Sequence, residues 1–524
     1  MAKGGSGYGE QAGGGLMSGT VNTAFVPDMQ RKLYRWSTAN PDTVFSDLFN
    51  LVCDRRTLDV AWQKLARNKG SQTPGTDGVT RKKVEERPGG VAAFLANIRE
   101  ELRSETYCPE PVRQRLIPKS GKPGKMRPLG IPTLKDRLVQ MALKLVLEPI
   151  FEADFYPTSY GFRPGRSTHD ALATAQLKLQ PDHGGPSKYR YVIEGDIKGC
   201  FDAIDHHVLM ERVRRRIADH KVLRLTLAFL KAGIMAEGAI RHPVTGTPQG
   251  GVISPMLANI YLAAIDERYG RGSSRPREHP REAYDRRYYD RKKGRTTFFS
   301  VRYADDFIVF MDGTREQAEA EKQALAEFLR RELRMELSIE KTRITAVEDG
   351  FDFLGYRVVQ EKSRRTGRMV GKLFIPKSKL NDLRYKTKGK VRGMPPGKPL
   401  AELIDRLNPI ILGWRNYYRY AVGASRDFTG LDWWMRQRVG RWLRKKYPKA
   451  TLYEIRRRFA GSTRGNRARW CEGTTRLRFF REGGTSYFRY RGIRIANGWN
   501  ADPNEWFRPG AKEFWSSFDT LAHM

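Results

Sequence analysis

The chain has 524 residues, with 96 Lys or Arg against 58 Asp or Glu, so its formal net charge is +38 and its pI is about 10.2. A charge excess of this size favours a polyanionic partner such as nucleic acid over simple solubility, and it predicts salt-dependent binding. No apolar run is long enough to cross a membrane, and the four scattered cysteines form no Cys-x-x-Cys pair, which argues against a membrane protein, a zinc site and a disulfide framework.

Glycines and turn residues divide the first part of the chain. Residues 1–20 include eight glycines, and we expect a disordered tail there. An amphipathic helical pattern lies between about residues 40 and 70, inside an N-terminal extension that we place at 21–85. The run Ser71–Gly78 is rich in turn residues and predicts a loop.

A basic, extended stretch follows at residues 107–135 and leads into a predicted helix at 136–150. Within the basic stretch, Lys119 and Arg127 lie on a segment that glycine and proline stiffen. We take the pair as candidates to bind a triphosphate, the lysine as a point charge and the arginine as a planar fork. The alternative is that both are solvated cations of an ordinary loop.

An apolar strand predicted to begin at Tyr191 ends in a carboxylate, Asp196, and Phe201 follows five residues later. Such a strand carries its terminal acid to the end of a sheet, where a second acidic strand can meet it. Asp202 and Asp205 come after the chain has turned, so we assign them to helix capping or ion pairing.

The stretch Phe299–Phe310 holds two adjacent carboxylates, Asp305 and Asp306, between two β-prone apolar runs, and it predicts a hairpin with both acids at its turn. Neighbouring anions repel one another unless a cation lies against them, and magnesium is the usual ion of an all-oxygen site. If Asp196 lies beside Asp305, two metal ions can bind, one activating a 3′-hydroxyl and the other stabilising the departing pyrophosphate. The alternative is a solvated acidic turn, which fits poorly with such apolar flanks.

Between the two acidic strands, Thr247–Pro255 places glycines beside Gln249, ahead of an apolar helical stretch. Glycine lets the backbone approach a ligand closely, so Gln249 is a candidate to contact a nucleotide or a template base. A plain turn before a helix explains the pattern equally well. Residues 268–295 are polar and strongly basic, and they predict a surface insertion.

The C-terminal part of the chain predicts a linker, a helical segment and a basic end. Residues 385–400 are rich in Lys, Gly and Pro, which favours a linker. One helical face is then expected, formed by Leu403, Leu407, Ile410, Ile411 and Trp414. Residues 441–500 hold 17 Lys or Arg against three acids, interleaved with aromatic side chains, a composition suited to single-stranded nucleic acid.

These blocks and their order resemble a group II intron-encoded reverse transcriptase, or maturase, over about residues 70–450. The blocks are Ile117-Pro-Lys119 with Arg127-Pro-Leu-Gly-Ile-Pro132, Ser159-Tyr-Gly-Phe-Arg-Pro-Gly-Arg166, Asp196 to Phe201, Pro248-Gln-Gly250, Tyr303-Ala-Asp-Asp306, Glu340-Lys-Thr342 and Phe353-Leu-Gly355. The resemblance implies an α+β, right-hand polymerase with fingers and palm at 86–375 and a helical thumb called domain X at 376–450. The basic, aromatic-rich composition beyond it predicts a DNA-binding C-terminal region at 451–524. Some relatives carry a nuclease built on paired cysteines and histidines at this end; because only Cys471 and His523 lie here, we expect none.

The resemblance also implies roles for individual residues. The metal-binding positions of the family fall on Asp196, Asp305, Asp306 and the backbone carbonyl of Ile197, which would hold two Mg²⁺ ions. The nucleotide-binding positions fall on Lys119, Arg127, Gln249 and Phe201, the last matching the aromatic gate that excludes a 2′-hydroxyl. Lys341 matches a lysine that protonates the departing pyrophosphate, although a lysine there could equally just bind phosphate. The candidates for RNA or DNA contacts are Arg163, Arg166, Arg415, Arg419, Arg456, Arg464 and Arg467.

The main hypothesis from the sequence is an RNA-directed DNA polymerase that binds its intron RNA, assists splicing and copies the inserted intron from a DNA primer. Its expected partners are intron RNA, target DNA and deoxynucleoside triphosphates in a bacterial cytoplasm, with a homodimer left open. One rival is an RNA-binding splicing factor whose polymerase has lapsed, against which the intact acids argue. The other is a domesticated reverse transcriptase for DNA repair or phage defence, which would share the same site.

Overall fold

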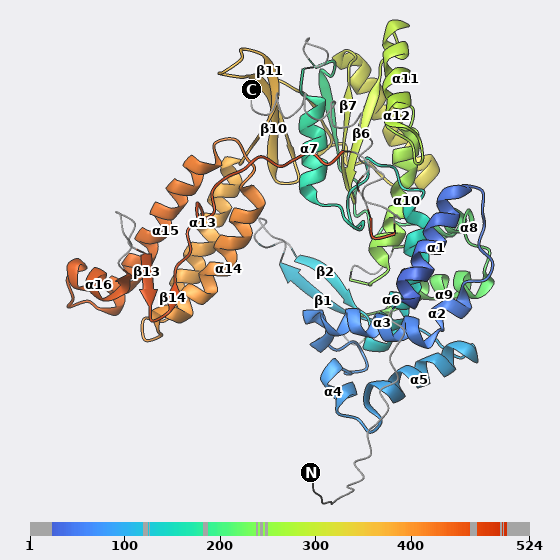
Figure 1. Cartoon of the computed structure of the whole chain (residues 1–524), viewed down its shortest axis with the longest axis horizontal. Coiled ribbons are helices and arrows are strands. Elements are labelled where there is room, and N and C mark those ends of the chain that lie inside the picture. Colours follow the sequence, from blue (N-terminus) through green and yellow to red (C-terminus); the bar gives the residue numbers. More distant parts are fainter. Residues whose placement is uncertain are drawn as a thin grey trace, which may run out of the picture.

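The computed structural model describes residues 24–118, 124, 126–181, 187–236, 239–241, 245–246, 250–461, 469–492, 495 and 497–499. The molecule combines many helices with mainly antiparallel sheets, which confirms the α+β class (Figure 1). Across these ranges, no helix has both the length and the apolar character that a membrane span requires.

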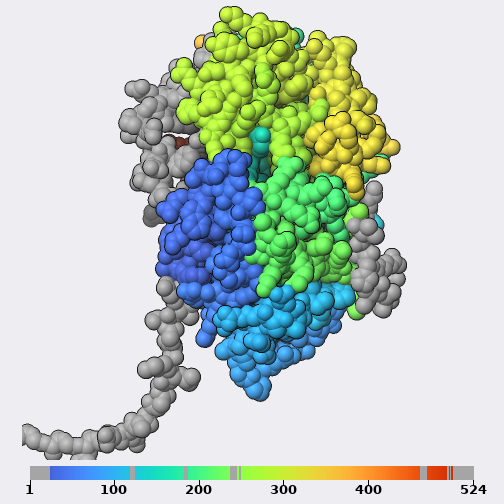
Figure 2. All heavy atoms as spheres, turned by 90° about the vertical axis from the view of Figure 1, so that its right-hand side faces the viewer, coloured from blue at the N-terminus to red at the C-terminus, as the bar shows by residue number. Residues whose placement is uncertain are grey.

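Helices make up most of the N-terminal part of the molecule. They are α1 (Phe25–Ala39), α2 (Phe49–Val52), α3 (Arg55–Ala66), α4 (Arg81–Glu85), α5 (Gly90–Arg103) and α6 (Leu134–Glu152), the last of which confirms the helix predicted at 136–150. In the contact of α1 with α6, the buried Gln30 amide donates a hydrogen bond to the Leu145 carbonyl at 2.8 Å. Figure 2 shows these helices beside the segment of α8 (His206–Arg214) and α9 (His220–Lys231). There Asp219 accepts the backbone N–H of Leu48 at 2.8 Å, so the N-terminal extension is packed onto the rest of the chain.

A first sheet has the strand order β2-β1-β4-β5. Its strands are β1 (Val112–Pro118), β2 (Met126–Ile131), β4 (Ile234–Ala236) and β5 (Ala239–Arg241). β1 and β2 pair antiparallel, which confirms extended structure at residues 112–118 and 126–131 of the stretch predicted at 107–135, and β4 runs parallel to β1.

A central sheet has the order β6-β7-β3-β8. Its strands are β3 (Tyr191–Gly195), β6 (Phe298–Tyr303), β7 (Asp306–Met311) and β8 (Arg343–Ala346), all paired antiparallel. Both acidic strands predicted from the sequence are therefore present, and they are direct neighbours as β3 and β7.

The central sheet separates two hydrophobic cores. On β3 and β7, Ile193 and Val309 belong to a core shared with α6, α10 (Ser254–Arg268) and α12 (Arg315–Leu333). The alternate residues Val192 and Phe310 belong to a second core shared with α7 (Thr168–Lys178) and the C-terminal helices. Because successive side chains of a strand point to opposite faces and both faces are covered, the middle of each strand is apolar on both faces, at Val192 and Ile193 in β3 and at Phe307–Met311 in β7. This double burial fixes the ends of the strands, where the acids lie.

The C-terminal part contains a third sheet, a helical bundle and a small fourth sheet. Its elements are β9 (Phe351–Phe353), β10 (Tyr356–Lys362), β11 (Met369–Phe374), α13 (Lys377–Arg392), α14 (Leu400–Tyr418), α15 (Ala424–Lys446), α16 (Leu452–Phe459), β12 (Ala460–Gly461), β13 (Arg469–Glu472) and β14 (Thr475–Arg476). The bundle of α13, α14 and α15 stands to one side of the central sheet in Figure 1. The predicted apolar face of α14 is confirmed, with Leu403, Leu407 and Ile411 fully buried and Ile410 and Trp414 packed against them.

Tyrosines at the end of α14 connect the bundle to the third sheet. The Tyr418 hydroxyl donates to the Gly355 carbonyl at 3.1 Å, and the Tyr417 hydroxyl donates to the carbonyl of Leu354. In return, the Tyr356 hydroxyl donates to the carbonyl of Tyr417. Because tyrosines on each side donate hydrogen bonds to carbonyls on the other, the turn between β9 and β10 is fixed against the end of α14.

The prediction of a linker at residues 385–400 is wrong. Helix α13 continues through Arg392, and the connection to α14 is confined to 393–399. Leu383, Thr387 and Val391 recur every four residues and are buried, so they form the helical stripe that lysine and glycine masked in the composition.

The basic segment at 268–295 is more ordered than a plain surface insertion. It contains α11 (Pro280–Lys292), and the side chains of Arg287 and Asp290 on it are buried. Acids offset much of its charge, because Asp290 pairs with Arg271 at 2.7 Å and Arg286 pairs with Glu278. Sequence composition revealed the excess of arginine here but not the pairing.

The close contact of β3 with β7 gives a first prediction. A Cβ on Gly195 would lie 2.1 Å from Cζ of Phe307, so Gly195→Ala must displace the ring and should reduce the free energy of unfolding by about 1–3 kcal/mol. Gly389→Ala is the matched control, because nothing lies within 4 Å of a Cβ at that position in α13. We expect it to gain up to about 1 kcal/mol from helix propensity. Urea unfolding measures both, and equal stability of the two variants would contradict this account of the contact.

Candidate functional site

Asp305 and Asp306 lie at the tip of the hairpin of β6 and β7. Tyr303 pairs with Asp306, so Ala304 and Asp305 form a two-residue turn, and the predicted hairpin is confirmed. Ala304 has a φ of 58°, in the left-handed region that disfavours residues with a Cβ. A backbone of this kind persists only where its surroundings hold it. The turn is therefore held by its neighbours and does not form freely.

Asp196 lies next to this turn. β3 pairs antiparallel with β7, and the last pair of the ladder is Gly195 with Phe307. One position further along, Asp196 follows β3 and Asp306 begins β7, so the two carboxylates are neighbours across the strands. Sequence analysis placed Asp196 beside Asp305; the register places it beside Asp306, with Asp305 on the adjoining turn.

Crowding of the three acids changes the protonation of one of them. The side chain of Asp306 reaches solvent, yet burial by surrounding atoms, followed by the charges of Asp305 and Asp196, raises its pKa from 3.8 to about 6. Like charges held close together disfavour the ionised form of a carboxylate. A cation bound there would relieve the repulsion.

The backbone and side chain of Asp196 are held by the segment before β8. The Lys341 amine donates to Oδ2 of Asp196 at 2.8 Å, with about half of each side chain exposed. Ser338 donates its N–H to the Asp196 carbonyl at 2.8 Å, and the Asp196 N–H reaches the Thr342 hydroxyl at 3.4 Å. Lys341 therefore neutralises one of the three acids.

The three acids have the donor chemistry of a hard divalent cation, since each offers carboxylate oxygens and their mutual repulsion favours a bound positive charge. As the side chains are placed, the described ranges contain no group of three or more His, Cys, Asp or Glu side chains already arranged to hold a metal ion. The pairing of Asp196 with Lys341 accounts for this in part, because it turns one carboxylate toward the amine. The donor chemistry of these residues fits a divalent ion.

The predicted nucleotide-binding residues are only partly described. Arg127 lies on β2 with its side chain exposed, whereas Lys119 and Gln249 fall outside the described residues. Ile197 is 7% exposed and forms an isolated bridge with Leu337, beside Asp196. Phe201 is half-buried against the first core. Asp205 confirms its predicted role, since it caps α8 by accepting the Val208 N–H and pairs with Arg334 at 2.8 Å.

Two of the arginines predicted to bind nucleic acid, Arg163 and Arg166, make hydrogen bonds within the protein. Arg163 is buried, with a forked ion pair to Glu152 at 2.7 Å and hydrogen bonds to the carbonyls of Tyr156 and Ser159. Each of its three side-chain nitrogens is bonded within the protein and the side chain is buried, so the prediction that Arg163 contacts nucleic acid is corrected. Burial, followed by the charge of Arg163, lowers the pKa of Arg166 to about 10, and Arg166 donates to the Pro157 carbonyl at 2.8 Å.

The other predicted arginines lie in the C-terminal part. Arg415 donates to the Glu482 carbonyl at 2.6 Å, and the guanidinium of Arg419 lies over the Tyr420 ring. Arg456 is exposed on α16. Arg464 and Arg467 lie outside the described residues.

Sequence analysis missed a buried charged residue that contacts the hairpin turn of Ala304 and Asp305. Arg302 lies one residue before Tyr303 and is completely buried, and its partners are Asn259 and Asp266 on α10. A signal was present, because Asn259 and Asp266, seven positions apart, place two polar side chains on a single face of a mostly apolar helix.

Two protein families match different parts of this chain. The family described as Reverse transcriptase (RNA-dependent DNA polymerase) matches residues 117–358, and Group II intron, maturase-specific domain matches residues 384–460. The chain is 40% identical to Protein YkfC of Escherichia coli over 371 residues, covering 68% of this chain and 93% of that protein. It is 36% identical to the group II intron-encoded protein LtrA of Lactococcus lactis over 389 residues, covering 66% of this chain. The chain belongs to the group II intron-encoded reverse transcriptases and maturases.

The two matched ranges correspond to two structural parts of the molecule. The reverse transcriptase match spans the strands that carry Asp196, Asp305 and Asp306, and the maturase-specific match spans most of the bundle of α13, α14 and α15. The chain spans 61% of the length of LtrA. It also matches nuclear intron maturase 1 of Arabidopsis thaliana, at 35% identity over 100 residues, which are 19% of this chain and 13% of that protein.

The repulsion at the site predicts that Asp306→Asn stabilises the protein in the absence of divalent cations. Because the pKa of Asp306 is raised in the folded state, ionisation of this group removes stability as the pH rises from about 4 to about 6. The variant should therefore unfold at a higher temperature than the wild type at pH 7.5 in EDTA, and the difference should vanish near pH 4. Thermal unfolding across this range measures it. Asp405→Asn, on the exposed face of α14, is the control and should show no such trend; a gain for Asp306→Asn that persists at pH 4 would refute the electrostatic cause.

Proposed function

We propose that this protein is an RNA-directed DNA polymerase that adds deoxynucleotides to a primer at the site of Asp196, Asp305 and Asp306. The observation that carries the proposal is the convergence of these acids at the ends of neighbouring strands, where burial and then the charges of the other two acids raise the pKa of Asp306. An ordinary acidic turn has no need to gather a third carboxylate from a strand more than a hundred residues away.

The elements correspond to the parts of a right-hand polymerase. We assign the palm to the central sheet and its helices, the fingers to the sheet of β1 and β2 with α6, and together they form the unit placed at 86–375. We assign the thumb, domain X, to the bundle of α13, α14 and α15 at 376–450. Residues 451–524 are the proposed DNA-binding region.

Each side chain has a distinct part in the reaction. Asp196, Asp305 and Asp306, with the carbonyl of Ile197, would hold two Mg²⁺ ions. When bound, such ions activate a 3′-hydroxyl and stabilise the departing pyrophosphate. Lys341 neutralises Asp196 in this structure, and its exposed amine is placed to bind phosphate or to donate a proton to the leaving group.

The remaining residues select and hold the nucleotide. Arg127, exposed on β2, together with Lys119 and Gln249, would contact the incoming triphosphate and its base. Phe201 lies within five residues of Asp196 and would exclude a ribose 2′-hydroxyl by contact with the sugar.

We further propose that the protein binds its group II intron RNA, assists splicing and then copies the inserted intron from a primer in the target DNA. The net charge of +38 and the match to the maturase-specific domain support this role. Arg415, Arg419 and Arg456 remain candidates for contacts with nucleic acid, since they lie on or beside the thumb and none of them is buried.

Replacing one acid tests the polymerase. Asp305→Asn keeps the size of the side chain but removes its charge, so primer extension on an RNA template should fall at least about a hundredfold. Asp405→Asn should extend primers as the wild type does. Binding of intron RNA, measured in parallel by filter retention, should be unchanged in both. Splicing assistance by a wild-type protein that adds no nucleotides at any magnesium concentration would instead identify a splicing factor without polymerase activity.

A second variant tests the sugar gate. Phe201→Val shortens the side chain, so the ratio of ribonucleotide to deoxynucleotide incorporation should rise by roughly tenfold or more. Single-nucleotide extension with each triphosphate measures this ratio. Phe45→Val, which changes a buried phenylalanine outside the proposed site in the same way, is the control. An unchanged ratio for Phe201→Val would remove this residue from the nucleotide site.

A further inference from the structure

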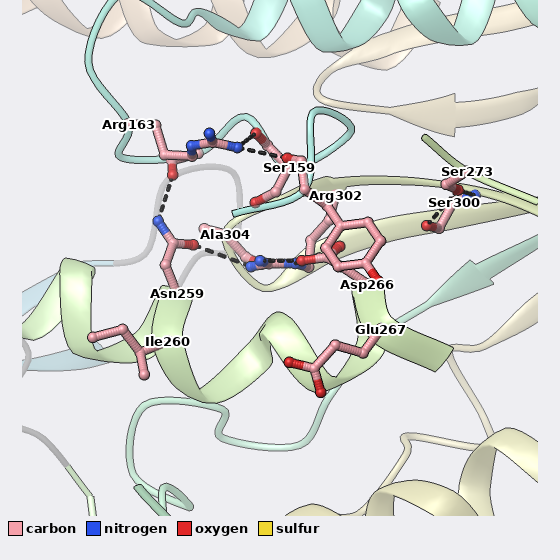
Figure 3. A network of polar contacts seen from close by, with 12 residues as sticks. Ser159, Arg163, Asn259, Ile260, Asp266, Glu267, Ser273, Ser300, Arg302 and Ala304 are labelled. Atoms are coloured by element: carbon pink, nitrogen blue, oxygen red, sulfur yellow. Dashed lines mark hydrogen bonds and ion pairs between the residues drawn. The ribbon is translucent and has the colours of Figure 1, made fainter. Parts of the chain in front are cut away.

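One buried arginine, Arg302, contacts the hairpin turn that carries Asp305. Arg302 lies on β6 next to Tyr303, and its side chain has no exposed surface. Its guanidinium lies between α10 and the hairpin turn in Figure 3. From there it contacts both the helix and the turn.

The Arg302 guanidinium donates hydrogen bonds to three different residues. Nε and Nη2 donate to the carboxylate of Asp266, Nη2 at 2.6 Å, while Nη1 donates to Oδ1 of Asn259 at 3.1 Å. Nη1 also donates to the carbonyl oxygen of Ala304 at 3.0 Å. Ala304 is the left-handed residue that begins the turn and directly precedes Asp305. One side chain therefore connects the turn to two fixed points on a buried helix.

The backbone around Arg302 is held at the same place. The Arg302 N–H donates to the Thr158 carbonyl at 3.0 Å, and the Arg302 carbonyl accepts the N–H of Tyr160 at 2.8 Å. Gly161 then lies so close to the turn that a Cβ on it would be 2.3 Å from the nitrogen of Ala304. Asn259, which accepts from Arg302, also donates to the Gly161 carbonyl at 2.8 Å and so links this segment to α10.

We propose that Arg302 is a positioning residue of the polymerase site: it fixes the Ala304 carbonyl and so sets where Asp305 and Asp306 stand. The inference rests on the proposed function and names a residue outside the metal-binding and nucleotide-binding positions given above. Only a planar fork can reach all three acceptors at once, whereas a lysine ammonium is a single point on a flexible stem.

Stability alone does not explain a charged pair at this position. Withdrawing two ions from water costs as much as their attraction returns, so an apolar pair of similar volume often supports a fold equally well. This property separates positioning from folding in an experiment. Arg302→Met/Asp266→Leu removes both charges together and keeps the core filled, while the link to the turn is lost.

The same helix supplies a matched control. Arg212 is also buried, donates to the Ile260 carbonyl at 2.9 Å and pairs with Glu267, the neighbour of Asp266 on α10. These contacts do not touch the turn. Glu267 is 43% exposed and also pairs with Arg215, so Arg212→Met/Glu267→Leu removes a less buried charged pair of α10, without removing a bond to the turn.

The test compares both double variants and Arg302→Lys with the full-length wild type, after thermal unfolding has shown that each is folded at the assay temperature. Primer extension gives kcat and KM for the template–primer, and electron paramagnetic resonance gives the affinity for Mn²⁺. We expect both Arg302 variants to lose about tenfold to a hundredfold in kcat, with KM within about twofold, because a small misplacement of reacting groups is costly. Mn²⁺ binding should weaken in the same variants, and the Arg212 control should match the wild type.

Two results would overturn the proposal. One is wild-type kcat and Mn²⁺ affinity in either folded Arg302 variant, and the other is an equal loss in the Arg212 control. Failure of the proposed function is a different result, namely no primer extension by the wild type, and in that case the Mn²⁺ affinities still decide whether Arg302 positions the acids.

Discussion

Repulsion among Asp196, Asp305 and Asp306 is the constraint that the rest of the structure has to meet. The acids lie at the ends of two strands that pair directly, so backbone hydrogen bonds hold their charges together. Burial, followed by the charges of Asp305 and Asp196, raises the pKa of Asp306. Burial on both faces of the sheet offsets this cost, since β3 and β7 contribute to one core on one side and to another core on the other. Lys341 offsets part of the charge, and Arg302 holds the turn from within.

This arrangement places a local negative site in a strongly positive molecule. The net charge of +38 attracts the phosphate backbone of a nucleic acid from any direction, without selecting a sequence. The acids instead select small divalent cations at one point. A polymerase needs both, because a long anionic substrate has to be held while one bond forms between two anionic partners. The bundle of α13, α14 and α15 is joined to the third sheet by Tyr356, Tyr417 and Tyr418, so the surface proposed to hold the duplex is fixed to that sheet.

Local patterns in the sequence were sufficient for the hairpin, for α6 and for the face of α14, because each depends on residues within one or two turns or strands. They were insufficient where the deciding partner is distant. Arg163 was expected to bind nucleic acid, yet it is buried against Glu152, 11 residues away, in a pairing that no spacing rule indicates. Arg302 was overlooked since its partners are 36 and 43 residues away on α10. The helix α13 was mistaken for a linker because lysine and glycine outweighed three buried positions at helical spacing.

The central claim is that these three acids together hold divalent cations. X-ray diffraction from crystals of the full chain soaked in Mn²⁺, with data collected at the manganese absorption edge, tests it directly. The account predicts anomalous peaks within coordination distance of Asp196, Asp305 and Asp306, with Lys341 displaced from Asp196. Manganese bound only elsewhere on the molecule, with the Lys341 ion pair intact, would contradict it.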